Sequence, residues 1–418
     1  MPNNGNPINL ATMQAALKEL YDGQTVEDLT NKKNPLWALM KKEKNFFGSV
    51  YPVPNKFANS SGASATFAQA QANQSGFMLS RFNLTRTRDY AIATLDQETM
   101  LASSNSAGAF VEAAKETIDS TIEQVANRLG QALYGSGSGT IGQIGTINAG
   151  GVIQLAAPGA VVSFEVNQVL QATTLDGNAA GLLAAVGYVV AVNRYLGQIT
   201  VSAAPLGQGA PGIPGVATVP WAAGMFLLTA GDMNAKVLGL QAWIPATPPT
   251  PGSLFLGVDR SIDTRLQGQV YDGSMQTIEE ALIDGSALLS REGADPTVLM
   301  VSYPTWSALE KSLGSKKVIV DNRIGNVGFK GLQLTGADTT INVYADRNCP
   351  AYTGFLLDMS TWAFKSIGDA PRFLDWGAQG NEGWLRMSNA DACEVRVGWY
   401  GNVYTTAPNR NMMLKLSA

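Results

Sequence analysis

Apolar residues recur every three or four positions between residues 106 and 133, and this is the most regular pattern in the chain. Such spacing predicts one amphipathic helix. Ser106 is a suitable N-cap residue, and Gly135 is a suitable terminator. The helix would be about 42 Å long at 1.5 Å per residue. Because its other face is charged, we expect the helix to pack lengthwise on one side of a sheet.

Residues 46–95 show a different pattern, which predicts an extended hairpin. Residues 58–75 are small and polar, as expected of a tip. On the return limb, Phe82, Leu84, Tyr90 and Ile92 share one face at a period of two. That limb would be about 50 Å long at roughly 3.3 Å per residue. Because a two-stranded hairpin cannot bury its own faces, it needs a surface to lie on.

The N-terminal residues 1–45 are expected to form an arm that is mostly helical from residue 8. Leu10, Met13 and Leu17 have helical spacing, and Pro35 is suited to the first position of a short second helix. The densest basic cluster of the chain lies here. Its five lysines suit either a solvated helix flank or an inward, DNA-facing role: Lys32, Lys33, Lys41, Lys42 and Lys44.

Residues 140–232 differ sharply from the rest of the chain in composition. Between residues 140 and 231 the charged residues are Glu165, Asp176 and Arg194. Short strand-like runs alternate with turns, which predicts a small β-barrel or sandwich. The segment follows a flexible Gly/Ser linker at residues 135–139, so we interpret it as an insertion.

The remaining residues, 233–418, mix both periodicities. Helices are expected at residues 274–290 and 304–313, around a buried strand at 297–302. Further strands are expected toward the C-terminus, at 340–345, 354–358, 362–365, 394–404 and 412–416. This order predicts an α+β unit with helices on an antiparallel or mixed sheet.

Composition excludes several function classes. Only 15% of the 418 residues are charged and the net charge is −4, whereas a dedicated nucleic-acid binder is strongly basic. Any DNA contact should therefore be local and non-specific. The chain contains no histidine, which removes Ser-His-Asp catalysis and histidine-ligated zinc. We expect Cys349 and Cys393 to be reduced and buried.

No segment has the features of a targeting signal, a membrane span or a cofactor site. The first residues are polar, and the longest apolar run, 182–192, is shorter than the roughly 20 residues that a span needs. The glycine-rich residues 135–142 lack the Gly-Lys-Ser/Thr ending of a phosphate loop. Glu279 and Glu280 are adjacent at a helix start, where acids complement the helix dipole. We therefore expect no enzyme activity, cofactor or metal.

Three groups of residues are candidates for contacts with other subunits. The hairpin carries a basic set consisting of Lys56, Arg81, Arg86 and Arg88. A mixed-charge cluster suits either a surface ion-pair patch or a subunit contact: Asp259, Arg260, Asp263 and Arg265. In a glycine-rich loop, Trp376 and Trp384 are either interface anchors or loop staples.

The order of these parts resembles the Hong Kong 97-type fold of tailed-phage major capsid proteins. That family has an N-arm, an extended E-loop hairpin, a spine helix, and P- and A-domains. The segment from Asp295 to Leu309 is similar to a strand–link–helix phrase of its A-domains, and Glu394–Val403 is similar to its last P-domain strands. The implied division is 1–45 N-arm, 46–95 E-loop, 96–139 spine helix and start of the P-domain, 140–232 insertion, and 233–418 A-domain with the remaining P-domain.

The resemblance implies a structural shell subunit forming hexamers and pentamers around double-stranded DNA. It implies a location in the virion after assembly in the host cytoplasm. Expected partners are a separate scaffold protein, a portal, a decoration protein and the packaged DNA, without a membrane. Some family members link an E-loop lysine to a P-domain asparagine, here Lys56 with Asn402 or Asn409, but we expect non-covalent assembly. The alternatives are an encapsulin-like compartment and a carboxylate-dependent glycosidase.

Overall fold

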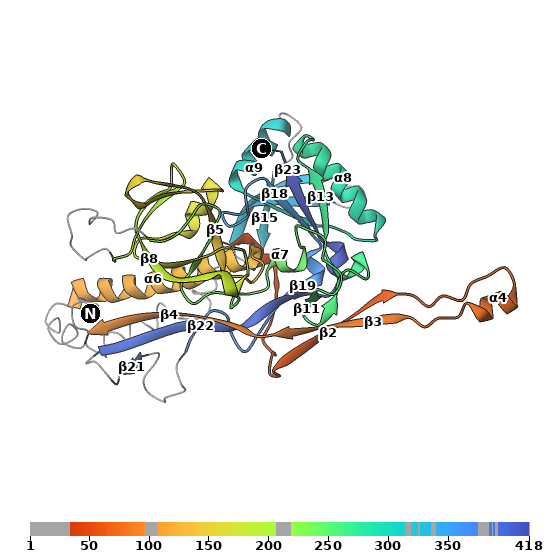
Figure 1. Ribbon diagram of the computed structural model, residues 1–418, viewed down its shortest axis with the longest axis horizontal. Coiled ribbons are helices and arrows are strands. Elements are labelled where there is room, and N and C mark those ends of the chain that lie inside the picture. The colour runs from red at the N-terminus through yellow and green to blue at the C-terminus, as the bar shows by residue number, and fades with distance from the viewer. Residues whose placement is uncertain are drawn as a thin grey trace.

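The computed structural model describes residues 34–96, 107–205, 219–313, 319–324, 327–335, 340–374, 384–386, 388 and 392–417. Figure 1 shows a broad body from which one thin hairpin projects. The body combines a long helix on a sheet, a β-barrel above that helix, and an α/β unit beside the barrel. The fold is therefore a mixed arrangement of helices and several sheets.

The long helix α6, Ala107–Tyr134, lies on a six-stranded sheet, as its amphipathic pattern predicted. Its inner side includes Ile122, Val125 and Leu129, which are each at most 1% exposed. Gly135 follows the last helical residue, in agreement with its predicted role, whereas Ser106 lies outside the described residues. The sheet has the order β1-β19-β22-β20, and β4 and β21 also pair with β22. Its strands are β1 (Lys41–Glu43), β4 (Thr87–Asp96), β19 (Trp362–Ser366), β20 (Arg372–Phe373), β21 (Trp384–Arg386) and β22 (Ala392–Thr405).

The projecting hairpin consists of β2, Val50–Ala58, and β3, Met78–Thr85, with the short helix α4, Phe67–Ala72, near its tip. The predicted continuous limb through residue 92 is wrong. Strand β3 pairs with β2, but β4 pairs with β22 in the body. Phe82 and Leu84 are fully buried, whereas Tyr90 and Ile92 are 43% and 57% exposed. The buried side chains are at even-numbered positions in β3 but at odd-numbered positions in β4, because Arg86 lies between the two strands.

The low-charge segment forms a closed six-stranded barrel with the order β10-β5-β6-β9-β8-β7. Its own core includes Phe164, Leu170 and Val201, all fully buried. Strand β5 continues directly from the glycine-rich linker, and the sequence pattern did not predict it. The strands are β5 (Thr140–Asn148), β6 (Val152–Leu155), β7 (Val169–Thr173), β8 (Leu182–Asn193), β9 (Gln198–Ser202) and β10 (Phe226–Thr229).

The α/β unit is built on a mixed seven-stranded sheet with the order β13-β23-β18-β14-β17-β16-β15. Helices α8, Ile278–Arg291, and α9, Tyr303–Leu313, pack on it, close to their predicted bounds. Thr277 and Glu280 form a capping box, so Glu280 has a structural role. The strands are β13 (Gln269–Gly273), β14 (Val298–Val301), β15 (Ile319–Ile324), β16 (Val327–Thr335), β17 (Thr340–Ala345), β18 (Thr353–Leu357) and β23 (Met412–Leu416); β13, β15 and β16 were not predicted.

Short elements join these parts. Helix α3, Pro35–Leu39, begins at proline as predicted and buries Leu36 and Trp37, while residues 1–33 of the predicted arm lie outside the described residues. The others are α7 (Leu240–Trp243), β11 (Leu254–Phe255), β12 (Val258–Asp259) and the 3₁₀ turns η1 (Ala149–Gly151), η2 (Pro158–Ser163), η3 (Ala179–Gly181), η4 (Thr264–Leu266), η6 (Met359–Thr361) and η7 (Pro408–Arg410). Within the described part of the chain, no helix combines the length and apolar character of a membrane span.

Candidate assembly surfaces

The hairpin projects away from the body (Figure 1), and large apolar side chains are exposed on α4 and around the start of β3. Phe67, Phe77 and Leu79 are 84%, 58% and 60% exposed. No charged residue occurs between Lys56 and Arg81. Because several large apolar side chains are exposed in this uncharged stretch, the tip of the hairpin, residues 57–80, is a candidate contact with another molecule.

The basic residues expected to follow the hairpin divide into two groups. Lys56 and Arg81 lie on the hairpin itself, with the Lys56 Nζ atom 5.7 Å from the centre of the Phe77 ring. Arg86 lies at the base, where its Nη1 atom donates to the Phe46 carbonyl at 2.9 Å. Arg88 lies in β4 and is exposed. The structure therefore does not place the four cations on one surface of the hairpin, and their contact with another subunit stays a prediction.

A buried lysine fixes the base of the hairpin, and sequence analysis did not single it out. Lys365 is 3% exposed, and its Nζ atom lies 3.1 Å from the Glu43 Oε2 atom and 3.9 Å from the centre of the Tyr51 ring. The Tyr404 hydroxyl donates to the same Glu43 oxygen at 3.1 Å. Desolvation raises the pKa of Glu43, but Lys41, Lys365 and Tyr404 outweigh it, so this pKa is lowered overall. Tyr51 thereby ties strand β2 to the six-stranded sheet.

Four charged side chains meet where α6, β4 and the exit of the barrel converge. The Arg128 guanidinium donates to Asp89 at 2.8 Å and to Asp232 at 3.0 Å. The Lys236 Nζ atom lies 2.8 Å from Asp89 and 3.1 Å from Asp232. Burial alone would raise the pKa of Asp89, but Arg128 and Lys236 more than offset it, so the pKa lies below its ordinary value. The cluster holds the barrel exit against the helix and the sheet.

The mixed-charge cluster at residues 259–265 does not form one patch of ion pairs among the described residues. The Asp259 carboxylate accepts the Gly252 amide at 2.8 Å and the Ser261 hydroxyl at 2.6 Å. Arg260 donates to the Ala242 carbonyl at 2.7 Å, and desolvation lowers the pKa of Arg260 to about 10. Asp263 and Arg265 pair at 3.2 Å. Asp259 and Arg260 therefore stabilise the local loop, and a role of the cluster in subunit contact remains a prediction.

The other predicted residues have the following positions. Lys41 pairs with Glu43 at 3.0 Å, Lys42 lies 4.9 Å from the centre of the Trp37 ring, and Lys44 pairs with Asp369. These three lysines thus have acidic or aromatic neighbours within the chain. Lys32, Lys33 and Trp376 lie outside the described residues, and Trp384 is described through the backbone of β21.

The two candidate asparagines for a covalent link differ in accessibility. Asn402 is fully buried; its amide donates to the Thr85 carbonyl at 2.9 Å and accepts the Leu238 amide at 2.9 Å. Asn409 is half-buried. Asn402 is therefore poorly placed for a bond to another subunit. Cys349 is buried and free, as expected, and the side chain of Cys393 lies outside the described part.

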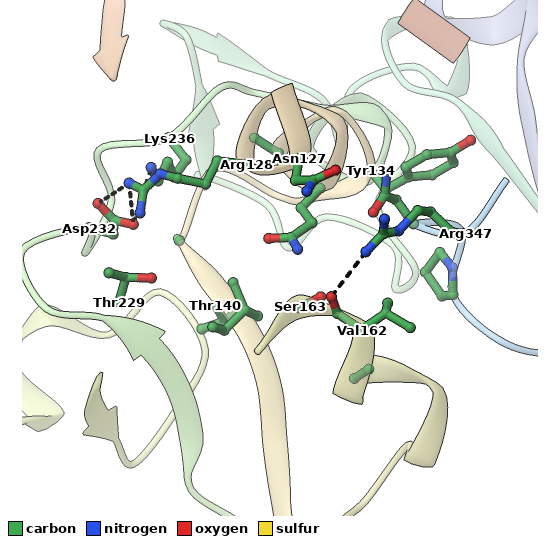
Figure 2. A pocket seen from close by; sticks show the side chains of 18 of the residues that line it. Asn127, Arg128, Tyr134, Thr140, Val162, Ser163, Thr229, Asp232, Lys236 and Arg347 are labelled. Atoms are coloured by element: carbon green, nitrogen blue, oxygen red, sulfur yellow. Dashed lines mark hydrogen bonds and ion pairs between the residues drawn. The ribbon is translucent and has the colours of Figure 1, made fainter. Parts of the chain in front are cut away.

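A cleft of about 1180 Å³ separates the barrel from α6 and from residues 347–351. Figure 2 shows Arg128, Asp232 and Lys236 on one side of it and Arg347 on the other. The Arg347 Nη2 atom donates to the Val162 carbonyl of the barrel at 3.3 Å. No group of three or more potential metal ligands occurs among the residues that the structure describes. The cleft therefore carries no recognisable metal centre.

No protein-family model and no curated protein matches the sequence. Solved structures do match. A chain of the cyanophage A-1(L) capsid asymmetric unit is 10% identical, with a TM-score of 0.51 over 91% of this chain and 92% of that chain. The capsid of a native GTA particle is also 10% identical, with a TM-score of 0.45 over 100% and 95%. A chain from Mycobacterium phage Bobi, 10% identical, has a TM-score of 0.42 over 93% and 91%. The chain therefore has the fold of the cyanophage capsid chain.

Proposed function

We propose that this chain is the major capsid protein of a tailed bacteriophage and assembles into the icosahedral head around double-stranded DNA. Its fold, shared with the cyanophage capsid chain over nine-tenths of both chains, supports this proposal. Its role is structural, without a catalytic step. In this view the hairpin β2–β3 is the E-loop, α6 the spine helix, the six-stranded sheet the P-domain and the seven-stranded sheet the A-domain.

The hairpin tip carries the proposal. Phe67, Phe77, Met78 and Leu79 are each more than half exposed in the isolated chain. Burying such a side chain is worth about 1.5–3 kcal/mol. A soluble monomer gains nothing from holding these side chains away from its body, whereas a shell subunit gains a long-range contact. We therefore propose that the tip packs on a second copy within hexamers and pentamers.

The barrel at residues 140–232 fits an added domain, because it has its own core and is carried by the body between α6 and α7. A separate scaffold protein, a portal and a decoration protein complete the proposed set of partners. The proposed location is the virion, with assembly in the host cytoplasm.

Electron microscopy of the expressed full-length chain tests the proposal. We expect capsomers or closed particles, either spontaneously or with a scaffold protein. A well-folded product that stays monomeric under every assembly condition, scaffold included, would refute the shell function. The nucleic acid content of purified particles distinguishes a phage head from an encapsulin-like compartment, which would enclose protein instead.

A further inference from the structure

The face of the six-stranded sheet opposite α6 carries arginine and tyrosine side chains that lie away from the hairpin tip. In β4, Ala91 and Ala93 are buried toward the helix, whereas Tyr90 and Ile92 point the other way and are 43% and 57% exposed. Directly opposed residues share one face of an antiparallel pair. The pairing of Arg88 with Tyr400 and of Ile92 with Arg396 therefore extends this outer face onto β22.

The side chains on this face converge around Tyr400. The Tyr90 and Tyr400 rings meet edge to face at 5.9 Å, and their hydroxyl oxygens are 3.5 Å apart. The Arg372 guanidinium, from β20, lies 5.9 Å from the centre of the Tyr400 ring. The hydrogen bond with Tyr90 and burial raise the pKa of Tyr400, while the charges of Arg372 and Arg88 oppose this. Both arginines thus lie close enough to act on one phenol.

Positive charge on this face is not balanced by carboxylates in the described part of the chain. Arg396 pairs with Glu394, but neither Arg88 nor Arg372 has an ion pair among the described residues. The Arg372 Nε atom is buried and has no hydrogen-bond partner there. Since the buried Nε atom is out of reach of a ligand, the positive charge that this face offers comes from exposed Arg88 and half-buried Arg372, although the whole chain has a net charge of −4.

The two sides of this sheet differ in character. On one side lie α6 and then the barrel, whose segment 140–231 holds three charged residues. On the other side lie the arginines. A shell around DNA has one side toward a polyanion and one toward solvent, and a local cationic field concentrates a polyanion even on an acidic protein. Guanidinium groups bind phosphate bidentately, and tyrosine hydroxyls donate to phosphate oxygens.

We propose that this arginine–tyrosine face (Arg88, Tyr90, Arg372, Arg396 and Tyr400) binds the phosphate backbone of double-stranded DNA and lines the inside of the shell. The inference rests on the proposed function for the identity of the polyanion. It assigns the DNA-facing role to these residues of β4, β20 and β22 and not to Lys41, Lys42 and Lys44 in and beside β1, whose neighbours within the chain already include Glu43, Trp37 and Asp369. Binding is independent of base sequence, because phosphate contacts carry no sequence information.

Fluorescence anisotropy with a labelled 24-base-pair duplex of random sequence tests the inference on the unassembled full-length protein across a salt series. Each phosphate contact contributes about 0.9 to the slope of log K against log salt. The double variant Arg88→Gln/Arg372→Gln should bind at least about tenfold more weakly at low salt, with a slope smaller by roughly two. The charge-conserving variant Arg88→Lys/Arg372→Lys should retain most of the slope.

Two matched controls remove the same charge elsewhere. Lys56→Gln/Arg81→Gln alters the hairpin, and Lys41→Gln/Lys44→Gln alters the alternative basic site; both should leave the slope nearly unchanged. The inference is overturned if the arginine pair does not change the slope, or if the lysine pair lowers it instead. It is also overturned if the glutamine variant blocks particle formation while duplex binding persists, since the face is then a subunit contact. The duplex assay does not require particles, so its failure is distinguishable from failure of the shell function.

Discussion

Arg128 of the long helix and Asp89 of the sheet beneath it are joined by two hydrogen bonds, with Nε–Oδ2 and Nη2–Oδ1 distances of 3.2 Å and 2.8 Å. The same guanidinium reaches Asp232, at the exit of the barrel. Asp89 is 5% exposed, so its carboxylate depends on Arg128 and Lys236 for compensation. Arg128 thereby couples the helix to the sheet through Asp89 and to the barrel through Asp232.

Replacing Arg128 with leucine should destabilise the subunit strongly. The change leaves Asp89 buried with one cation instead of two, and breaking a buried ion pair from one side costs about 3–5 kcal/mol. Urea unfolding of the unassembled subunit measures the loss. Arg194→Gln is the matched control, because it breaks the exposed pair with Glu165 and should cost no more than about 0.5 kcal/mol. Equal effects of the two changes would contradict the role given to Asp89.

The same cluster predicts an acid-sensitive contribution to stability. The pKa of Asp89 is lowered in the folded protein from its ordinary value of 3.8, despite the opposing effect of burial. Its contribution is therefore fully present above the unfolded pKa and is lost as the pH falls through the lower folded pKa. Unfolding free energy measured from pH 6 downward should fall less steeply in Asp89→Asn, which should be less stable at pH 6. A variant with the slope of the parent would disprove this linkage.

Gly130 of α6 should not tolerate alanine. A Cβ atom there would lie 2.3 Å from the Asn34 Oδ1 atom and 2.7 Å from the Asn348 Nδ2 atom. These amides bond to each other at 2.9 Å, and Asn34 also bonds the helix backbone at Ala126. Despite the better helix propensity of alanine, we expect a loss of about 1–3 kcal/mol in thermal unfolding.

Gly159→Ala is the control for that substitution, because a Cβ atom at Gly159 meets nothing within 4 Å. It should be neutral or slightly stabilising, by less than about 1 kcal/mol. If Gly130→Ala behaves in the same way, the close approach of Asn34 to the helix does not constrain the fold.

Replacing both Phe67 and Phe77 with serine should impair assembly without affecting the fold of the subunit. Both side chains are mostly exposed, so the free energy of unfolding should change by less than about 0.5 kcal/mol. Losing two apolar contacts of about 1.5–3 kcal/mol each should raise the protein concentration required for assembly at least tenfold. Light scattering during assembly measures this change.

The substitution Lys56→Gln tests whether the tip binds its partner by burying apolar side chains or through its charge. If the tip recognises its partner through apolar burial, this change should shift the assembly threshold by less than about twofold, since an exposed charge contributes little. A larger effect of Lys56→Gln than of the phenylalanine changes would instead support the prediction that the basic residues of the hairpin contact another subunit.

The strength of local patterns explains which elements could be predicted. Helix α6 was found because its apolar periodicity follows one continuous packing surface, and strand β23 because it is a nearly continuous apolar run. Strand β5 was missed because its glycines resemble a linker, and β13, β15 and β16 were missed because polar residues and glycines interrupt their apolar pattern. The limb through residue 92 was misassigned because Arg86 reverses the alternation where the chain changes sheet.

The features of the candidate sites likewise divide into those that the sequence predicts and those that arise only in the folded chain. The sequence by itself determined the long helix, the uncharged hairpin tip, the low-charge β segment and the order of parts that resembles a phage capsid subunit. The tertiary structure alone decided which distant charges meet, such as Asp89 with Arg128 and Lys236, and which cations share a face, such as Arg88 and Arg372. The physical reason is the separation, along the sequence, of the residues that interact. Periodicity and turns arise from neighbours along the chain, whereas ion pairs and binding faces join residues that are far apart in it. Asp89 and Lys236 are 147 positions apart, and the pairing of β4 with β22 joins residues such as Arg88 and Tyr400.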